Sequence, residues 1–317
     1  MSTAARVPET WDRTGDDPKE TLARTGRLNL LASAFARFRQ ADGTSHARSL
    51  AFAISLVLVQ AIVVLVGFAA AFGHSEVTST IVETIRSAVP GPASDVLAEA
   101  VRQANRVGNQ NRFLLLTIGL VGLLITSTTA MGQMERGLNR IYGIEKDRPT
   151  ARKYVLALVL TVTVGAGLGI AFLMLGFGRS IGRSWGHEAR IFWEVLRWPI
   201  GLVLIAVCLA AILRYSVNRR QPGRTWLAFG SGVAVTLWAL STIGLALAFR
   251  FASNFGQTYG PLAGIVALQL WTFLSSFSIF YGVAVAAELE AVRAGAGETK
   301  AASRELPASA APASLRG

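Results

Sequence analysis

The sequence predicts an all-α, polytopic membrane protein with six transmembrane helices and both termini in the cytoplasm. Of its 317 residues, 52% are hydrophobic and 16% are charged, whereas soluble domains carry about 25% charged residues. Uncharged apolar runs reach the roughly 20 residues that a helix needs to cross a bilayer. The basic residues behind the net charge of +12 stand between these runs and not in one patch. Composition, run length and charge placement together indicate a bundle of membrane-spanning helices.

We expect three regions along the chain. Residues 1–27 should be a disordered cytoplasmic tail, residues 28–293 the membrane domain, and residues 294–317 a second disordered tail rich in Ala, Ser and Pro. The fourth span is short, but Arg197 and Arg214 at its ends can extend their guanidinium groups to the headgroup region. The six predicted spans cover residues 49–72, 113–135, 154–178, 198–213, 225–249 and 261–287.

The placement of Arg and Lys predicts the orientation. The two tails and the second and fourth loops carry most of the 31 basic residues, and loops rich in basic residues stay in the cytoplasm. The same residues predict attraction to anionic lipid headgroups at the cytoplasmic face. We expect membrane lipids as partners, allow for a homo-oligomer, and expect no nucleic acid, because the basic residues do not form one soluble patch.

Two kinds of amphipathic pattern lie outside the spans. Residues at helical spacing near the N-terminus predict a helix that either lies on the membrane surface or packs on the bundle. They are Leu28, Leu31, Phe35 and Phe38. The long first loop holds two shorter patterns on either side of Pro90–Pro92, which predict a helical hairpin outside the cytoplasm. These patterns consist of Val77, Ile81 and Ile85, then Leu97, Val101 and Ala104.

The chain lacks the clustered residues and spacings that hold a catalytic or structural metal ion. His46, His74 and His187 lie far apart, and Cys208 is the single cysteine. No zinc-binding or phosphate-loop motif occurs. We therefore expect no catalytic residue, no metal site, no cofactor and no enzymatic activity.

Polar side chains in two spans are the strongest functional candidates, because such residues are costly in lipid. One face of the second span carries Thr128, Glu135, Asn139 and Tyr142. One face of the sixth carries Gln269, Thr272 and Ser276, and its apolar run ends at Glu288. One interpretation is hydrogen bonding between helices that holds a bundle together. The other is a polar path for a substrate, with Glu135 and Glu288 at its ends as ionisable groups that bind a cation or a proton.

Small residues predict sites where helices pack closely. Gly165 and Gly169 form a GxxxG pair in the third span, and Gly260 and Gly264 form another at the start of the sixth. Without a Cβ on that face, two helix backbones can approach each other.

Two stretches resemble the YihY/virulence factor BrkB family. MERGLNRIYGIEKDRPTARKYVLALVLT, residues 134–161, resembles its signature region, in which an LN pair precedes an aromatic-Gly pair, a charged run and RP. These features fall on Leu138-Asn139, Tyr142-Gly143, Glu145–Arg148 and Pro149. The last two spans also resemble the family, at Tyr259-Gly260, Leu262, Gly264, Leu270-Trp271, Phe273–Ser275 and Ala287–Leu289.

The resemblance implies a six-span protein of the bacterial inner membrane. The family has no established molecular activity, and its former label, ribonuclease BN, is regarded as mistaken. With the two polar faces, the resemblance leads us to expect transport or handling of a lipid or another amphiphilic or small substrate in the bacterial envelope. The first alternative is a non-catalytic envelope scaffold, a virulence-associated membrane protein similar to one that confers serum resistance. The second, and the least favoured, is a ribonuclease.

Overall fold

The computed structural model describes residues 3–12, 18–71, 76–145, 148–181, 187–221, 223–251 and 261–296. These residues contain helices and connecting segments, with no strand among them, which confirms the all-α class. In chain order the helices are α1 (Pro18–Thr25), α2 (Arg27–Gln40), α3 (Gly43–Ala71), α4 (Glu76–Ala88), α5 (Pro92–Ile141), α6 (Thr150–Ile181), α7 (His187–Ser216), α8 (Arg224–Phe251) and α10 (Pro261–Arg293).

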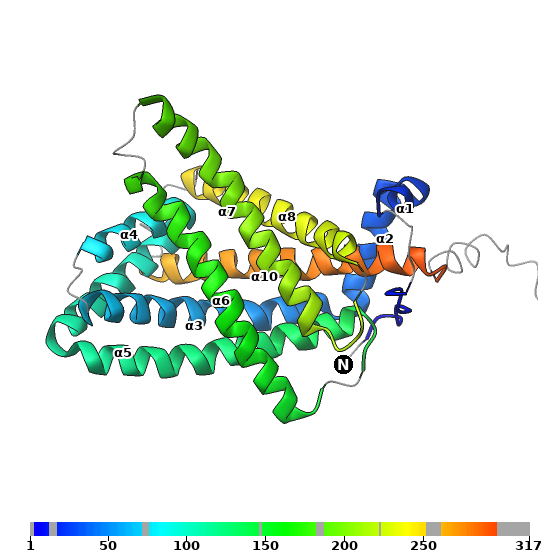
Figure 1. Cartoon of the computed structure of the whole chain (residues 1–317), viewed down its shortest axis with the longest axis horizontal. Coiled ribbons are helices and arrows are strands. Elements are labelled where there is room, and N and C mark those ends of the chain that lie inside the picture. The colour runs from blue at the N-terminus through cyan, green and yellow to red at the C-terminus, as the bar shows by residue number, and fades with distance from the viewer. Residues whose placement is uncertain are drawn as a thin grey trace, which may run out of the picture.

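Helix α10 lies at the centre of the bundle and packs against α2, α3, α5 and α8. The axes of α3, α10 and the long part of α5 are roughly aligned, with α3 running opposite to the other two, whereas α6 and α7 cross them obliquely (Figure 1). Small residues let α8 and α10 approach closely. A Cβ added at Gly230 would lie 2.6 Å from the Cβ of Ala286, and one added at Gly282 would lie 2.6 Å from the Cβ of Ala234.

Five helices of the described residues are long and apolar enough to cross a membrane. They cover Gly43–Ala71, Gln110–Ile141, Trp198–Ser216, Thr225–Phe251 and Leu262–Arg293. The short fourth run is among them. The third predicted span falls within α6, which is not, and the side chains of α6 are described only as far as Gly167. A multi-pass membrane protein is therefore supported, and the count of six spans stays a prediction.

The first loop forms two helices where the sequence predicts them, and the second of these runs on into the second span. Gly91, with φ of 54°, separates α4 from α5, and Ile81 and Ile85 of α4 join Leu97 of α5 in one apolar cluster. Helix α5 then continues into the second span through a kink at Asn111, whose φ is −149°. The placement of this region outside the cytoplasm stays a prediction.

Helix α2 packs on the bundle, which was one of the two expectations for it. Leu30, Ala34 and Phe38 are buried, and the Phe38 ring meets that of Phe277 on α10 at 4.8 Å between centroids. The opposite face presents Leu28, Leu31 and Phe35 outward. The outward face keeps open the prediction that α2 also rests on the membrane surface.

The glycines expected at close helix contacts differ in their surroundings. A Cβ at Gly264 would collide with the Val96 side chain and lie 2.9 Å from the carbonyl oxygen of Pro92, so α10 does approach α5 there. Gly165 is exposed, and an added Cβ would meet nothing within 4 Å, so it is not a packing site among the described residues. Gly169 and Gly260 fall outside the residues whose surroundings are described.

This contrast predicts opposite effects of one substitution. Gly264→Ala should lower the free energy of unfolding by about 1–3 kcal/mol, the usual cost of overpacking. Gly165→Ala should change it by less than about 1 kcal/mol and in the stabilising direction, because Ala favours helix over Gly. Thermal unfolding in detergent measures both variants. Equal losses in the two would contradict the packing of Gly264 against α5.

Candidate functional site: a buried polar end

Three buried or largely buried ion pairs gather at one end of the bundle. They join Arg37 of α2 to Glu288 of α10 at 2.7 Å, Glu135 of α5 to Arg148 at 3.3 Å, and Arg219 to Glu290 of α10 at 2.5 Å. We call the region of these three pairs the polar end. The first pair joins α2 to α10, the second joins α5 to the segment before α6, and the third joins the segment after α7 to α10, so the polar end links several parts of the fold.

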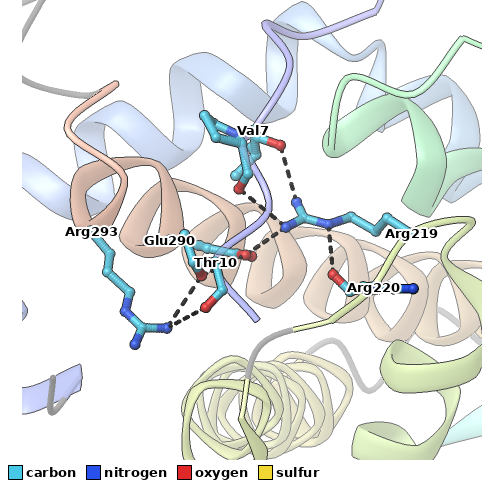
Figure 2. A network of polar contacts seen from close by, with 7 residues as sticks. Val7, Thr10, Arg219, Arg220, Glu290 and Arg293 are labelled. Carbon is cyan, nitrogen blue, oxygen red and sulfur yellow. Dashed lines mark hydrogen bonds and ion pairs between the residues drawn. The ribbon is translucent and has the colours of Figure 1, made fainter. Parts of the chain in front are cut away.

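Arg219, between α7 and α8, links Glu290 of α10 to the chain around Val7 (Figure 2). Its Nη2 donates to Glu290 Oε1 at 2.5 Å and to the carbonyl oxygen of Pro8 at 3.2 Å, and its Nη1 donates to that of Val7 at 3.3 Å. The guanidinium lies 4.8 Å from the ring centroid of Tyr142. The Arg219 side chain is only 3% exposed. Because a buried charge needs partners, this arginine is tied to the polar end and cannot reach out to the lipid headgroups.

Arg148 has a comparable role, although its position in a basic loop predicts only the orientation of the chain in the membrane. Its Nη1 donates to Glu135 and, at 2.7 Å, to the carbonyl oxygen of Ser216, and its Nη2 donates to that of Val217 at 2.8 Å. Helix α7 ends at Ser216. Arg148 therefore satisfies carbonyl groups that the end of a helix leaves without an intrahelical partner.

Residues 3–12 form an ordered segment, which we call the N-terminal strap. The amide N–H of Ala4 donates to the carbonyl oxygen of Arg140 at 3.2 Å, and that of Val7 to the carbonyl oxygen of Tyr142 at 3.1 Å. The Thr10 hydroxyl donates to Glu290 at 3.0 Å. The expectation of a wholly disordered tail is therefore wrong for residues 3–12, and α1 adds a helix at Pro18–Thr25. The remaining residues of that tail before Pro18 fall outside the described residues.

Three of the predicted path residues on α5 do share one face, and that face is buried at the polar end. Glu135 pairs with Arg148, and Asn139 Oδ1 accepts the backbone N–H of Asn218 at 3.0 Å. Tyr142 follows at the end of α5, where burial raises the pKa of its phenol and keeps it neutral. Helical spacing therefore identified the shared face. The partners of Glu135 and Asn139, however, lie in the segments that connect the helices.

The predicted path residues on α10 divide between two places. Glu288 lies at the polar end. Gln269 accepts a hydrogen bond of 3.0 Å from the Ser55 hydroxyl of α3, as expected if polar residues hold helices together. Thr272 and Ser276 are fully buried and donate to carbonyl oxygens of their own helix. Thr128, on α5, is partly buried. A continuous path along these residues stays a prediction.

A cavity of about 620 Å³ lies beside the polar end. The strap forms one wall, and the segments after α5 and after α7 form the other. Its lining residues are Thr3, Ala4, Arg6, Val7, Glu9, Gly143, Ile144, Glu145, Asn218 and Arg219. Among the described residues, no group of three or more His, Cys, Asp or Glu side chains could hold a metal ion.

The chain is similar along most of its length to several bacterial proteins. YfkH of Bacillus subtilis, which its name describes as ribonuclease-like, is 24% identical over 269 residues, or 80% of this chain and 93% of YfkH. A UPF0761 membrane protein of Cronobacter sakazakii is 27% identical over 276 residues, or 86% of this chain and 92% of that relative. One of Methylibium petroleiphilum is 27% identical over 274 residues, or 84% of this chain but 64% of the relative.

Some relatives are thus longer than the part that this chain spans, and no solved structure matches the chain significantly. The match to a family model is extensive, because the model described as Virulence factor BrkB covers residues 34–307. The chain is therefore a membrane protein that belongs to the virulence factor BrkB family.

Proposed function

We propose that this protein moves or handles an amphiphilic substrate, in the first place a lipid, at the bacterial plasma membrane. The polar end is then its cytoplasmic gate, seen closed. The observation that carries the proposal is the set of three ion pairs, Arg37–Glu288, Glu135–Arg148 and Arg219–Glu290, which close one end of the bundle. Ionisable residues placed inside a membrane bundle are costly, and they most often serve a pathway or a switch.

The energetics of buried ion pairs favour a gate over a simple brace. A buried pair gains little net stability, because taking both charges out of water offsets most of their attraction. Well-packed apolar residues would hold the same segments together at least as firmly. An ion pair differs in that its two charges can separate and each can then bind water, a substrate headgroup or a cation. Glu135 and Glu288, which both lie at the polar end, would be the groups exchanged in this way.

The surroundings of the polar end support a lipid and a cytoplasmic position. The outward face of α2 carries Leu28 and Phe35, with the exposed cations Arg27 and Arg39 on the same helix. Such a helix lies well at a membrane surface that contains anionic lipids. The basic residues of the neighbouring loops favour the cytoplasmic side. Assembly into a homo-oligomer is compatible with this arrangement and is not needed for it.

Lipid movement by the purified protein tests the proposal. In vesicles that contain NBD-labelled phosphatidylglycerol, the protein should let dithionite reach label from the inner leaflet, which protein-free vesicles protect. Glu288→Gln weakens one gate pair and should raise the initial rate about fivefold, since a loss of 1 kcal/mol changes a two-state equilibrium by about that factor. Glu99→Gln is the matched control, because Glu99 pairs with Arg102 at an exposed site outside the polar end.

Two results would contradict this proposal. Vesicles with the wild-type protein that behave as protein-free vesicles would remove lipid movement and favour the scaffold. Equal rates for wild-type, Glu288→Gln and Glu99→Gln proteins would remove the gate.

The name of one relative gives a second candidate, a ribonuclease. The purified protein would then cleave single-stranded RNA when a divalent metal is added, and chelation would stop it. We expect no cleavage with Mg²⁺, Mn²⁺ or Zn²⁺, because the sequence lacks a recognisable set of catalytic or metal-binding residues. Cleavage that purifies together with the protein would support the ribonuclease instead.

A further inference from the structure

The N-terminal strap is bound by the same side chains that form the gate pairs. Arg37 donates to Glu288 and also, at 2.8 Å, to the carbonyl oxygen of Ala5. Arg219 donates to Glu290 and also to Val7 and Pro8. Two of the three gate arginines therefore bind a gate carboxylate and the strap at the same time, so the strap and these pairs must respond to each other.

Thr10 extends this link to the carboxylate itself. Its hydroxyl donates to Glu290 Oε1, the oxygen that also accepts from Arg219. Arg293, at the end of α10, donates to the carbonyl oxygen of Thr10 at 3.1 Å (Figure 2). The second oxygen of Glu290, Oε2, is buried and lacks a hydrogen-bond partner among the described residues. Release of Thr10 would therefore remove one of the two hydrogen bonds that Glu290 Oε1 accepts, so the bound strap helps to hold this buried carboxylate in place.

The strap can open without the bundle. Just three of its residues, Ala4, Val7 and Thr10, are buried. Segments with few buried apolar contacts open at a small fraction of the free energy of global unfolding. The strap also forms one wall of the cavity of about 620 Å³, so its departure would remove that wall.

We propose that the N-terminal strap is an intramolecular lock, which must leave the polar end before the gate can open. The proposal rests on the proposed function, because only lipid movement makes the polar end a gate. The lock itself is a conformational change, however, and it can be tested without a transport assay. With the strap in place, Arg37, Arg219 and Glu290 are held together. With the strap released, the segment after α7 and the end of α10 separate.

Cysteine accessibility in the full-length chain tests the lock. Cys208 is the single cysteine, so Cys208→Ser gives a background without reactive thiols. Val217→Cys then reports on the polar end, because Val217 is fully buried next to Asn218, which lines the cavity. Val7→Asp should release the strap, since it places an unpaired charge at a buried site. We expect a membrane-impermeant maleimide to label Val217→Cys about tenfold faster or more in that variant.

Further variants separate the lock from a general loss of structure. Thr10→Val keeps the shape of the side chain but removes the hydroxyl bond to Glu290, and it should raise the labelling rate in the same direction. Glu9→Gln changes an exposed strap residue and should leave the rate at the wild-type value. If Ala4→Cys shows that Val7→Asp and Thr10→Val release the strap while Val217→Cys stays protected, the lock is disproved. If Val217→Cys becomes labelled but lipid movement is unchanged, the lock stands and the proposed function fails.

Discussion

Arg219→Ala is expected to lower the free energy of unfolding by about 3–5 kcal/mol, as the removal of one partner from a buried ion pair usually does. The substitution leaves Glu290, only 1% exposed, without its strongest partner inside the protein. It also removes the donors to Val7 and Pro8 and the cation over the ring of Tyr142. Thermal or denaturant unfolding in detergent, followed by tryptophan fluorescence, measures the loss.

Two controls show whether the loss of stability comes from the buried charge of Glu290. Arg102→Ala breaks an exposed ion pair with Glu99 and should cost less than about 1 kcal/mol. The double variant Arg219→Met with Glu290→Met removes both charges and should be more stable than Arg219→Ala, because no carboxylate is left buried and unpaired. If Arg219→Ala were no more harmful than Arg102→Ala, Arg219 would not be holding the polar end together.

The spans could be predicted because their signal is local. The run before Met134 is long and uncharged, so it forms a helix of spanning length wherever its neighbours lie. The contacts of a polar residue on such a helix are not local. Periodicity placed Glu135 and Asn139 on one face of α5, and only the fold shows that this face meets Arg148 and Asn218.

Arg148 and Arg219, two of the three arginines in the ion pairs of the polar end, were missed because basic residues between spans are usually explained by topology alone. Arg148 and Arg219 fit the positive-inside rule whether they face headgroups or reach into the bundle. Their carboxylate partners, Glu135 and Glu290, are 13 and 71 positions away. A signal was nevertheless present, because a carboxylate near the end of an apolar span needs a cation at the same depth.

The strap was missed for a different reason. Residues 3–12 are polar, contain Pro8 and have no helical or strand periodicity, which is also the composition of a disordered tail. The order of the strap comes from main-chain bonds to Arg140 and Tyr142 and from guanidinium groups of three other segments. None of these partners can be recognised from the strap sequence alone.

Gly143→Ala is expected to displace the strap and to be the second most harmful of these substitutions. Gly143 has φ of 77°, in the left-handed region where an alanine costs about 1–2 kcal/mol. A Cβ there would also collide with the backbone of Arg6 and lie 2.8 Å from the carbonyl carbon of Ala5. Because backbone atoms cannot turn away as a side chain can, the strap must shift, at a further cost of about 1–3 kcal/mol.

Gly295→Ala separates these two costs. Gly295 also has φ of 77°, but an added Cβ would meet nothing within 4 Å. It should show only the cost of the left-handed conformation, so the difference in the free energy of unfolding between the two variants measures the contact with the strap. In the Cys208→Ser background, Ala4→Cys should react with maleimide faster beside Gly143→Ala and at an unchanged rate beside Gly295→Ala. If both alanines had the same effect on stability and on labelling, the strap would not depend on the missing Cβ of Gly143. The strap would then be held at the polar end by its hydrogen bonds to main-chain groups, to Glu290 and to the arginines.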